Sequence, residues 1–197
     1  MADRSSARSS TRIEMASMTR YVAFLRAINV GGHTVRMETL RELFSAHGFS
    51  NVATFIASGN VIFETRSAAD RTLEEKLERR LESALGYSVA TFVRSEEEVR
   101  AISTYQAFSS AALKASRTLN IGFLREPLNP SARKALMSLK TPIDDFHVQG
   151  RELYWLCRKQ QSESTFSNKA FERAIQGTAT FRNATTIAKL AARLSSL

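Results

Sequence analysis

Residues 52–65 read VATFIASGNVIFET, and the fold follows from this stretch. Two runs rich in β-branched and aromatic residues, Val52 to Ala57 and Val61 to Thr65, flank Ser58-Gly59-Asn60. Such runs around turn-forming residues predict two strands joined by a hairpin or a bulged bend. The pattern of the first half of the chain extends from this hairpin in both directions.

A strand and a helix are predicted before the hairpin, and a helix and a strand after it. The strand Tyr21 to Ile28 precedes a helix from about Arg36 to His47, whose apolar side chains recur at the 3.6-residue period. After the hairpin, regularly spaced leucines mark a helix over about Ala69 to Leu85, and Tyr87 to Arg94 is typical of a strand. Ser95-Glu96-Glu97-Glu98 has the pattern of a capping box and opens a further helix.

The second half repeats this order of elements. The predicted elements are the strand Thr118 to Leu124, the helix Ser131 to Leu139, the strands Asp145 to Gln149 and Glu152 to Arg158 around Gly150-Arg151, the helix Lys169 to Gln176, the strand Thr178 to Arg182, and a helix to about Leu194 capped by Asn183. Both halves therefore follow the order β-α-β-β-α-β-α.

The βαββαβ order is that of the ferredoxin-like unit, so the sequence predicts an α+β protein with duplicated ferredoxin-like repeats, each with an additional helix. The similar strings ATFVRS at 90–95 and ATFRN at 179–183 support the duplication. We expect the first repeat over 18–103, a linker over 104–117 and the second repeat over 118–197. Because each sheet has helices on one face only, the two sheets should face or extend one another, or one free face should bind a partner.

The composition is that of a globular protein. The chain has 197 residues, 43% of them hydrophobic and 24% charged, which argues against wholesale disorder and fibrous repeats. No apolar run approaches the ~18 residues that a transmembrane helix needs, so no membrane partner is expected. The single cysteine, Cys157, excludes a disulfide framework and thiolate-rich metal sites and suits a reducing compartment, which favours a cytoplasmic location.

The first 17 residues, MADRSSARSSTRIEMAS, are expected to form a disordered tail. They contain no hydrophobic segment of a secretory signal. Arginines recur at a spacing typical of a mitochondrial targeting helix, but the acidic residues among them and the missing apolar face argue against one. Met18 stands directly before the first predicted strand, so the functional chain could begin there.

The positive charge of the chain is concentrated in its second half. The formal net charge is +9, of which residues 1–100 contribute +1 and residues 101–197 contribute +8. The electrostatic field of a positively charged surface attracts nucleic acid, phosphorylated metabolites or anionic lipid. A basic surface can also serve only to keep a protein soluble. The charge thus indicates classes of partner and leaves the choice among them open.

The stretch NVGGHT, Asn29 to Thr34, lies between a predicted strand and a predicted helix. Free backbone N–H groups and the helix dipole favour an anion at such a place. Gly31 and Gly32 would let the backbone approach a phosphate, and Arg26 belongs to the preceding strand. The stretch is neither a Walker A loop nor G-x-G-x-x-G, so an anion-binding loop and a simple tight turn are both open interpretations.

Three other polar stretches are candidates for the same site. Ser58-Gly59-Asn60 could present a hydroxyl and an amide, or could be ordinary turn residues. Ser167-Asn168-Lys169 opens one predicted helix and Arg182-Asn183 precedes another, which places basic side chains beside free N–H groups in a geometry suited to phosphate or carboxylate. The alternative for both is ordinary helix capping.

Nucleophilic and metal chemistry have little support in the sequence. A two-residue turn at Gly150-Arg151 pairs His147 with Tyr154 and puts Cys157 on the opposite face, which argues against a Cys–His dyad. The three histidines lack the spacing of metal ligands, and Glu96-Glu97-Glu98 is typical of a solvated helix start. We therefore expect no metal and no cofactor.

Nucleic-acid binding needs a separate test, because the ferredoxin-like sheet is also the scaffold of RRM domains. These domains stack bases on aromatic side chains of their central strands. Gly59 to Phe63 fits the required pattern only loosely, and Phe24 is the one aromatic that could accompany it. Sequence-specific RNA recognition is therefore not expected, whereas non-specific backbone binding through the basic second half stays open.

Three motifs resemble those of a bacterial family known as domain of unknown function 1697. They are LRAINVGG at 25–32, FIASGNVIF at 55–63 and T-x-R-N-x-x-T-x-x-K-L at 180–190, within a resemblance that runs from about Met18 to the C-terminus. The resemblance implies a fold and a set of marked positions but no reaction, because the family is biochemically uncharacterised. The marked positions, taken residue by residue, are Arg26, Asn29, Gly31, Gly32, Ser58, Gly59, Asn60, Lys169, Arg182, Asn183 and Lys189.

Two residues depart from the family pattern. Ala27 stands where many members have glycine, and Ala184 stands where an aromatic residue often follows the Arg-Asn pair. The second departure weakens any role for a stacking residue at the site.

The hypothesis from the sequence is that the marked loops converge on a polar, arginine-containing cleft that binds an anionic or phosphorylated small ligand. One alternative is an enzyme that positions its substrate in the same cleft through Ser58 or Asn29. The other is non-specific nucleic-acid binding through the basic second half. No residue pattern specifies a reaction or an oligomeric state.

Overall fold

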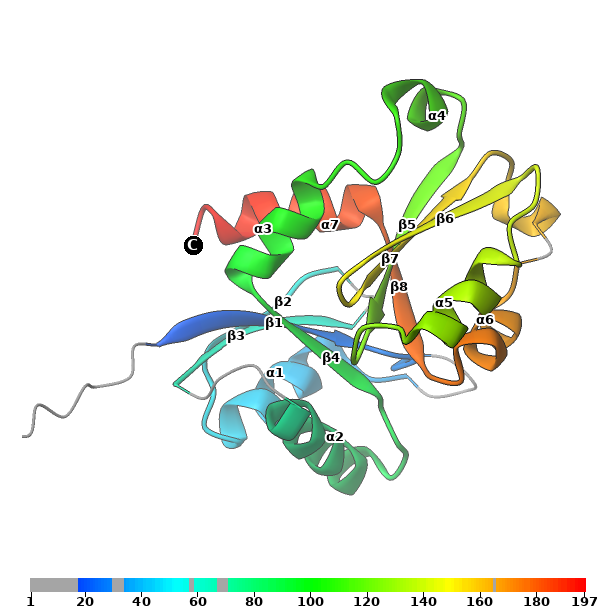
Figure 1. The fold of residues 1–197 in the computed structure, drawn as a ribbon. Helices are drawn as coiled ribbons and strands as arrows, with labels where there is room; N and C mark the ends of the chain where they lie inside the picture. The colour runs from blue at the N-terminus through cyan, green and yellow to red at the C-terminus, as the bar shows by residue number, and fades with distance from the viewer. Residues whose placement is uncertain (1–17, 30–33, 57–58, 67–70, 165) are drawn as a thin grey trace, which may run out of the picture.

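The computed structural model describes residues 18–29, 34–56, 59–66, 71–164 and 166–197, and the expected N-terminal tail lies outside this part. Two four-stranded antiparallel sheets, with strand orders β2-β3-β1-β4 and β6-β7-β5-β8, form its framework (Figure 1). Each order is that of a ferredoxin-like unit with two central strands running antiparallel. The structure thus confirms the predicted α+β class and the duplicated repeats.

The first repeat contains one sheet and three helices. Its elements are β1 (Thr19–Leu25), α1 (Met37–Ala46), β2 (Ser50–Thr54), β3 (Asn60–Thr65), α2 (Arg71–Leu85), β4 (Thr91–Ser95) and α3 (Glu96–Thr104). β1 ends earlier than predicted because Ala27 adopts φ 55°, a left-handed conformation that does not fit a strand. The capping box of α3 forms as predicted, since the Ser95 hydroxyl accepts from the Glu98 N–H and the Glu98 carboxylate accepts from the Ser95 N–H.

The second repeat has the same order of elements. They are β5 (Thr118–Leu124), α5 (Pro130–Met137), β6 (Asp144–Gln149), β7 (Glu152–Cys157), a short 3₁₀ helix (Gln161–Glu163), α6 (Asn168–Ile175), β8 (Ala179–Asn183) and α7 (Ala184–Leu194). His147 pairs with Tyr154 as predicted, and Cys157 belongs to the opposite face of the sheet. One short helix, α4 (Ser110–Lys114), was not predicted and lies in the expected linker, where Ser109 caps it. The domain boundaries themselves stay predictions.

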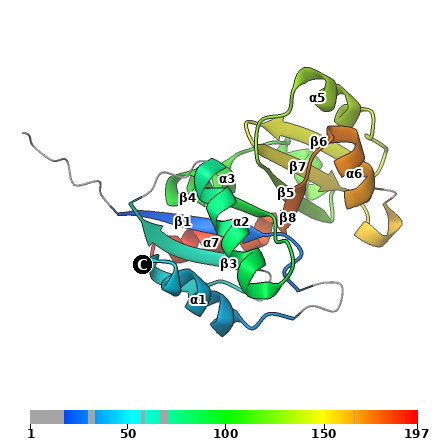
Figure 2. The same cartoon turned by 90° about the horizontal axis from the view of Figure 1, so that it is seen from below.

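The core is divided into three layers. α1 and α2 cover one face of the first sheet, and α5 and α6 cover one face of the second (Figures 1 and 2). The remaining faces of the two sheets meet in a shared central core, which α3 and α7 complete. At its centre the rings of Phe24 and Phe123 stack with centroids 3.9 Å apart. Of the three arrangements expected for the free sheet faces, the structure shows the one in which the sheets face each other.

Candidate functional site

Arg182 is the most highly connected of the sequence-predicted site residues. It lies at the end of β8 and is only 9% exposed. Its Nε donates to Asn60 Oδ1 (2.6 Å), its Nη1 to Thr180 Oγ1 (2.8 Å) and Phe181 O (2.9 Å), and its Nη2 to Leu25 O (2.9 Å) and Gly59 O (3.4 Å). These bonds occupy the donor capacity of the guanidinium, which has five N–H groups. All the acceptors are neutral, and burial lowers the pKa of Arg182 to about 10.

The structure therefore brings Arg182, Asn60 and Gly59 together, but as a buried connection between the repeats. Asn60 and Gly59 belong to the first repeat, at the start of β3, and both are buried. The guanidinium also lies over the Phe24 ring, 5.8 Å from its centroid. A side chain with this geometry ties β8 to the end of β1 and leaves little of its surface for a ligand.

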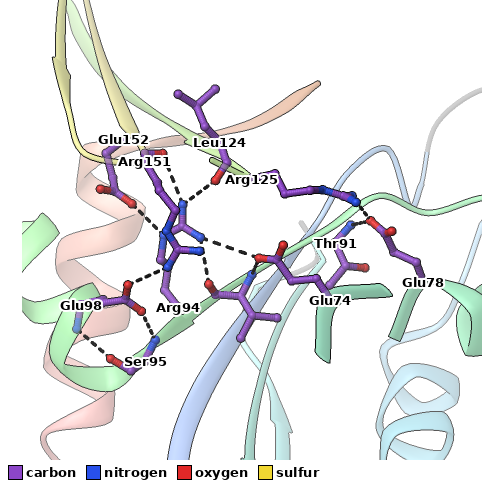
Figure 3. A network of polar contacts seen from close by, with 11 residues as sticks. Glu74, Glu78, Thr91, Arg94, Ser95, Glu98, Leu124, Arg125, Arg151 and Glu152 are labelled. Carbon is purple, nitrogen blue, oxygen red and sulfur yellow. Dashed lines mark hydrogen bonds and ion pairs between the residues drawn. The ribbon is translucent and has the colours of Figure 1, made fainter. Parts of the chain in front are cut away.

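Arg94, at the equivalent place in β4, makes the same connection in the opposite direction (Figure 3). Its guanidinium donates to Leu124 O (2.7 Å), Arg151 O (3.3 Å) and the Glu152 carboxylate (2.7 Å) in the second repeat. It lies over Phe123, 5.6 Å from the ring centroid, and is completely buried. Arg94 was not among the predicted site residues, although the paired strings ATFVRS and ATFRN align it with Arg182.

The two buried arginines differ in their counter-charges. Arg94 is paired with Glu152 and lies 3.9 Å from Glu74, whereas Arg182 has no carboxylate partner in the described part of the chain. Burial lowers the pKa of Arg94, and the Glu152 carboxylate opposes that change. Burial also raises the pKa of Glu74, against the Val93 N–H and the Arg94 charge, which both favour its ionised form. The same fold position thus holds a compensated cation in one repeat and an uncompensated one in the other.

A second reciprocal pair of arginines follows the ends of β1 and β5. Arg26 forms an ion pair with Glu172 of α6 (2.7 Å) and donates to Ala179 O (3.1 Å). Arg125, at the same place in the second repeat, pairs with Glu78 of α2. Each arginine therefore crosses to the second helix of the other repeat, and Arg26 already has a carboxylate partner.

Two of the other predicted residues serve local backbone geometry. Asn29 Oδ1 accepts a hydrogen bond from the Val35 N–H (2.7 Å) and closes the loop before α1. Asn183 Oδ1 accepts from the Thr185 N–H (2.9 Å) and is the N-cap of α7, as the capping interpretation predicts. These contacts engage both side chains without requiring a ligand.

The remaining predicted residues are not part of a described cluster. Lys169 in α6 and Lys189 in α7 are exposed and make no hydrogen bond or ion pair with the described residues. Gly31, Gly32 and Ser58 lie outside the described part of the chain. Of the predicted site residues, the structure brings Arg182, Asn60 and Gly59 together in a buried contact, and the convergence on a ligand-binding cleft stays a prediction.

A pocket of about 350 Å³ opens next to these connections, lined by residues of the second repeat and by Arg71 of the first. The loop after β5, the loop between α6 and β8, and the first residue of α2 form its walls. The lining residues are Arg71, Leu124, Arg125, Glu126, Pro127, Leu128, Asn129, Ala132, Ile175, Gln176, Gly177 and Thr178. The sequence LREPLN at 124–129 takes the place that LRAIN at 25–29 takes in the first repeat.

The charged groups of this pocket are ion-paired. Arg71 contacts Glu126 (3.0 Å) across the pocket and Glu75 (2.9 Å) on its own helix. The side chains of Arg71 and Glu126 are 64% and 66% exposed, whereas Arg125 and its partner Glu78 are mostly buried. These residues were not among the predicted site residues. The repeated Leu-Arg followed by asparagine, after the first strand of each half, could have indicated Arg125.

The described residues show neither a membrane-spanning helix nor a metal centre. None of their helices is both long and apolar enough to cross a bilayer. Within the same part of the chain, no three side chains of histidine, cysteine, aspartate or glutamate lie close enough to hold a metal ion. The side chains that line the pocket offer guanidinium, carboxylate, amide and hydroxyl groups.

A family model described as "Protein of unknown function (DUF1697)" matches residues 18–154. The chain belongs to this family. The predicted resemblance to DUF1697 is thus confirmed; the match contains the first two motifs, and the third, at 180–190, lies beyond it. A solved structure of the conserved bacterial protein SP0830 from Streptococcus pneumoniae is similar to this DUF1697 chain, with a TM-score of 0.75 and 24% identity over 91% of this chain and 99% of that one. At this identity the likeness shows the fold alone. Comparison with curated proteins gives no match.

Proposed function

We propose that this DUF1697 protein binds a phosphorylated or otherwise anionic small ligand in the pocket after β5. The observation that carries the proposal is the placement of Arg71 and Arg125 on the wall of a space of about 350 Å³. That volume lies in the range of small-molecule sites. Gln176 and Thr178 add an amide and a hydroxyl to the same wall and could complete the recognition of phosphate oxygens.

Arg71 is the group that we expect to contact the anion. Its ion pair with Glu126 is largely exposed, and exposed pairs contribute only about 0.2–1 kcal/mol. A phosphate offers three acceptor oxygens and forms stronger, bidentate contacts with a guanidinium, so it can displace Glu126. Arg125 stays bound to Glu78 and supports the loop, while Arg182, whose donors are all used, is not expected to bind the ligand directly.

A cytoplasmic location is part of this proposal, because phosphorylated metabolites are ligands of that compartment. The buried free thiol of Cys157 agrees with a reducing environment.

The proposal is tested by calorimetric titration of the full chain with inorganic phosphate, a sugar phosphate and a nucleoside monophosphate at low salt. Arg71→Gln should weaken binding about tenfold, which corresponds to the loss of about 1.4 kcal/mol. Glu126→Gln should strengthen it about two- to fivefold, because the competing carboxylate is removed. Arg100→Gln, which breaks a comparable exposed pair with Glu96, is the control and should leave affinity unchanged.

Two outcomes would contradict the proposal. One is the absence of heat and of thermal stabilisation with all three anions. The other is weaker binding of anions by Glu126→Gln than by the parent chain, since a displaced carboxylate cannot contribute to affinity.

A further inference from the structure

The outer helical layers of the two repeats differ in charge. α1 and α2 together carry five basic and six acidic residues. α5 and α6, which take the same positions on the second sheet, carry four basic residues and one acidic residue. That single acid, Glu172, is already paired with Arg26. This layer therefore has a net charge of +3, against −1 for the equivalent layer of the first repeat, and supplies part of the +8 of the second half.

The four basic side chains form what we call the basic face, defined as Arg133, Lys134, Lys169 and Arg173. All four are exposed, because the buried positions of α5 and α6 are apolar and point toward the sheet. α5 and α6 lie side by side on the outside of the second sheet (Figures 1 and 2). No acidic side chain of the described residues pairs with any of the four, and the one polar contact of the group is from Arg133 to Val148 O (3.1 Å).

We propose that the basic face binds the phosphate backbone of nucleic acid without recognising its bases. Counterion release from a nucleic acid requires only cations placed near phosphates, and duplex DNA carries one negative charge per about 1.7 Å of its axis. On α6, Lys169 and Arg173 stand four residues apart and so project from the same side of the helix, about 6 Å apart. This spacing lets both contact a single phosphate backbone.

No large hydrophobic residue is exposed on this face, which narrows the possible partners. The exposed large hydrophobic residues of the described chain are Met18, Ile56, Tyr105 and Leu197, and none belongs to α5 or α6. A protein partner generally needs a buried aromatic or aliphatic anchor. An interfacial membrane helix needs an apolar side to insert, and base stacking needs an aromatic ring. Binding to a phosphate backbone needs none of these groups. Adsorption to anionic lipid headgroups also needs none, and the vesicle measurement below separates the two.

The geometry sets an upper limit to the salt dependence. Four phosphate contacts give a slope of about −3.6 for log affinity against log salt concentration. Affinity should therefore fall about 150-fold between about 50 and 200 mM salt. None of the four residues lines the proposed ligand pocket, so this inference and the proposed function can fail separately.

The experiment measures binding of the full chain to a short labelled DNA duplex by fluorescence anisotropy over that salt range. The double variant Lys169→Gln/Arg173→Gln should weaken binding and reduce the slope to about half. The control is Lys76→Gln/Arg79→Gln, which removes the same charge from exposed positions of α2 and should leave the slope unchanged. Anionic phosphatidylserine vesicles are the competing probe, and the parent chain should bind them less tightly than the duplex at the same salt.

Three results would overturn the inference. The first is no binding to the duplex at the lowest salt concentration. The second is an equal loss of affinity in both double variants, which would indicate a general effect of net charge. The third is tighter binding to the vesicles than to the duplex, which would indicate a membrane surface as the partner.

Discussion

Replacing Arg94 with methionine should destabilise the protein more than the same replacement at Arg182, although the two arginines occupy equivalent places. Methionine replaces the aliphatic stem of arginine and removes the guanidinium group with its charge and its donors. At position 94 the change leaves the carboxylates of Glu74 and Glu152 without their cation, and their side chains are only 3% and 14% exposed. Breaking a buried ion pair in this way costs about 3–5 kcal/mol.

At position 182 the change leaves neutral acceptors. The bonds of Arg182 to Leu25 O and Phe181 O have counterparts in the bonds of Arg94 to Leu124 O and Val93 O, so their loss is common to both variants. The bonds that differ are those to Asn60 Oδ1 and Thr180 Oγ1. At about 1 kcal/mol for each of these two acceptors, the loss to compare with the broken ion pair is about 2 kcal/mol. Removal of a buried cation that has no carboxylate partner in the described structure partly offsets this loss. The two variants should thus differ by about 2 kcal/mol.

Urea unfolding at pH 7 and at pH 5 measures both the difference and its cause. Burial holds the pKa of Glu74 above its ordinary value, and the loss of Arg94 raises that pKa further. The native state of Arg94→Met then binds more protons than the unfolded chain, so its destabilisation should be smaller at pH 5 than at pH 7. The effect of Arg182→Met should be nearly the same at both pH values. Equal losses at pH 7, or an Arg94→Met loss that does not shrink at pH 5, would refute the reasoning.

Three further substitutions test local features. Glu74→Gln retains the acceptor for the Val93 N–H but removes a carboxyl group whose pKa in the folded protein is raised above its ordinary value of 4.5. As the pH rises above about 4.5, the unfolding free energy of the parent chain should therefore fall more steeply than that of the variant. Urea titrations at several pH values measure this difference. Gly122→Ala places a Cβ 2.7 Å from the Phe181 ring in the middle of β5, and calorimetry should show a loss of about 1–3 kcal/mol. Ile56→Gly removes the backbone strain of a β-branched residue held at φ 59°. The urea midpoint should rise by an amount equivalent to about 0.5–1 kcal/mol, and an unchanged midpoint would argue against strain at this position.

The sequence predicted the local structure well because local structure depends on neighbours in the chain. The capping box at Ser95, the hairpin that pairs His147 with Tyr154, and the cap at Asn183 all involve residues only a few positions apart. α4 was missed because its five residues show little apolar periodicity and its one clear signal is the cap at Ser109. Each of these features follows from spacing, which the sequence displays directly.

The contacts between the repeats could not be predicted in the same way. Side chains alternate along β8, so Arg182 lies on the same face as Thr180. In the adjacent strand it pairs with Ile121 of the shared core. The inward direction of Arg182 could therefore be predicted from the sequence. What alternation cannot give is the partner, because Asn60 is 122 positions away and meets Arg182 only when the two sheets pack face to face. In the sequence, Arg182 beside the cap of α7 therefore has the pattern of an anion-binding site, and its buried partners are identified only by the packing of the two sheets.

The reciprocal contacts also explain where the two repeats are free to differ. Arg94 and Arg182 satisfy the end of the first strand and the hairpin of the opposite repeat, so each repeat supplies donors that the other lacks. Because those positions are buried and mutually dependent, a change in one leaves unpaired groups in the other. The exposed basic residues of α5 and α6 form no ion pair with the first repeat in the described part of the chain, and here the outer layers diverge, from a nearly balanced first layer to a basic second one. Residues that distinguish the repeats at the surface, such as Arg71 at the pocket and Lys169 on the basic face, are therefore better candidates for function than the buried arginines that the repeats share.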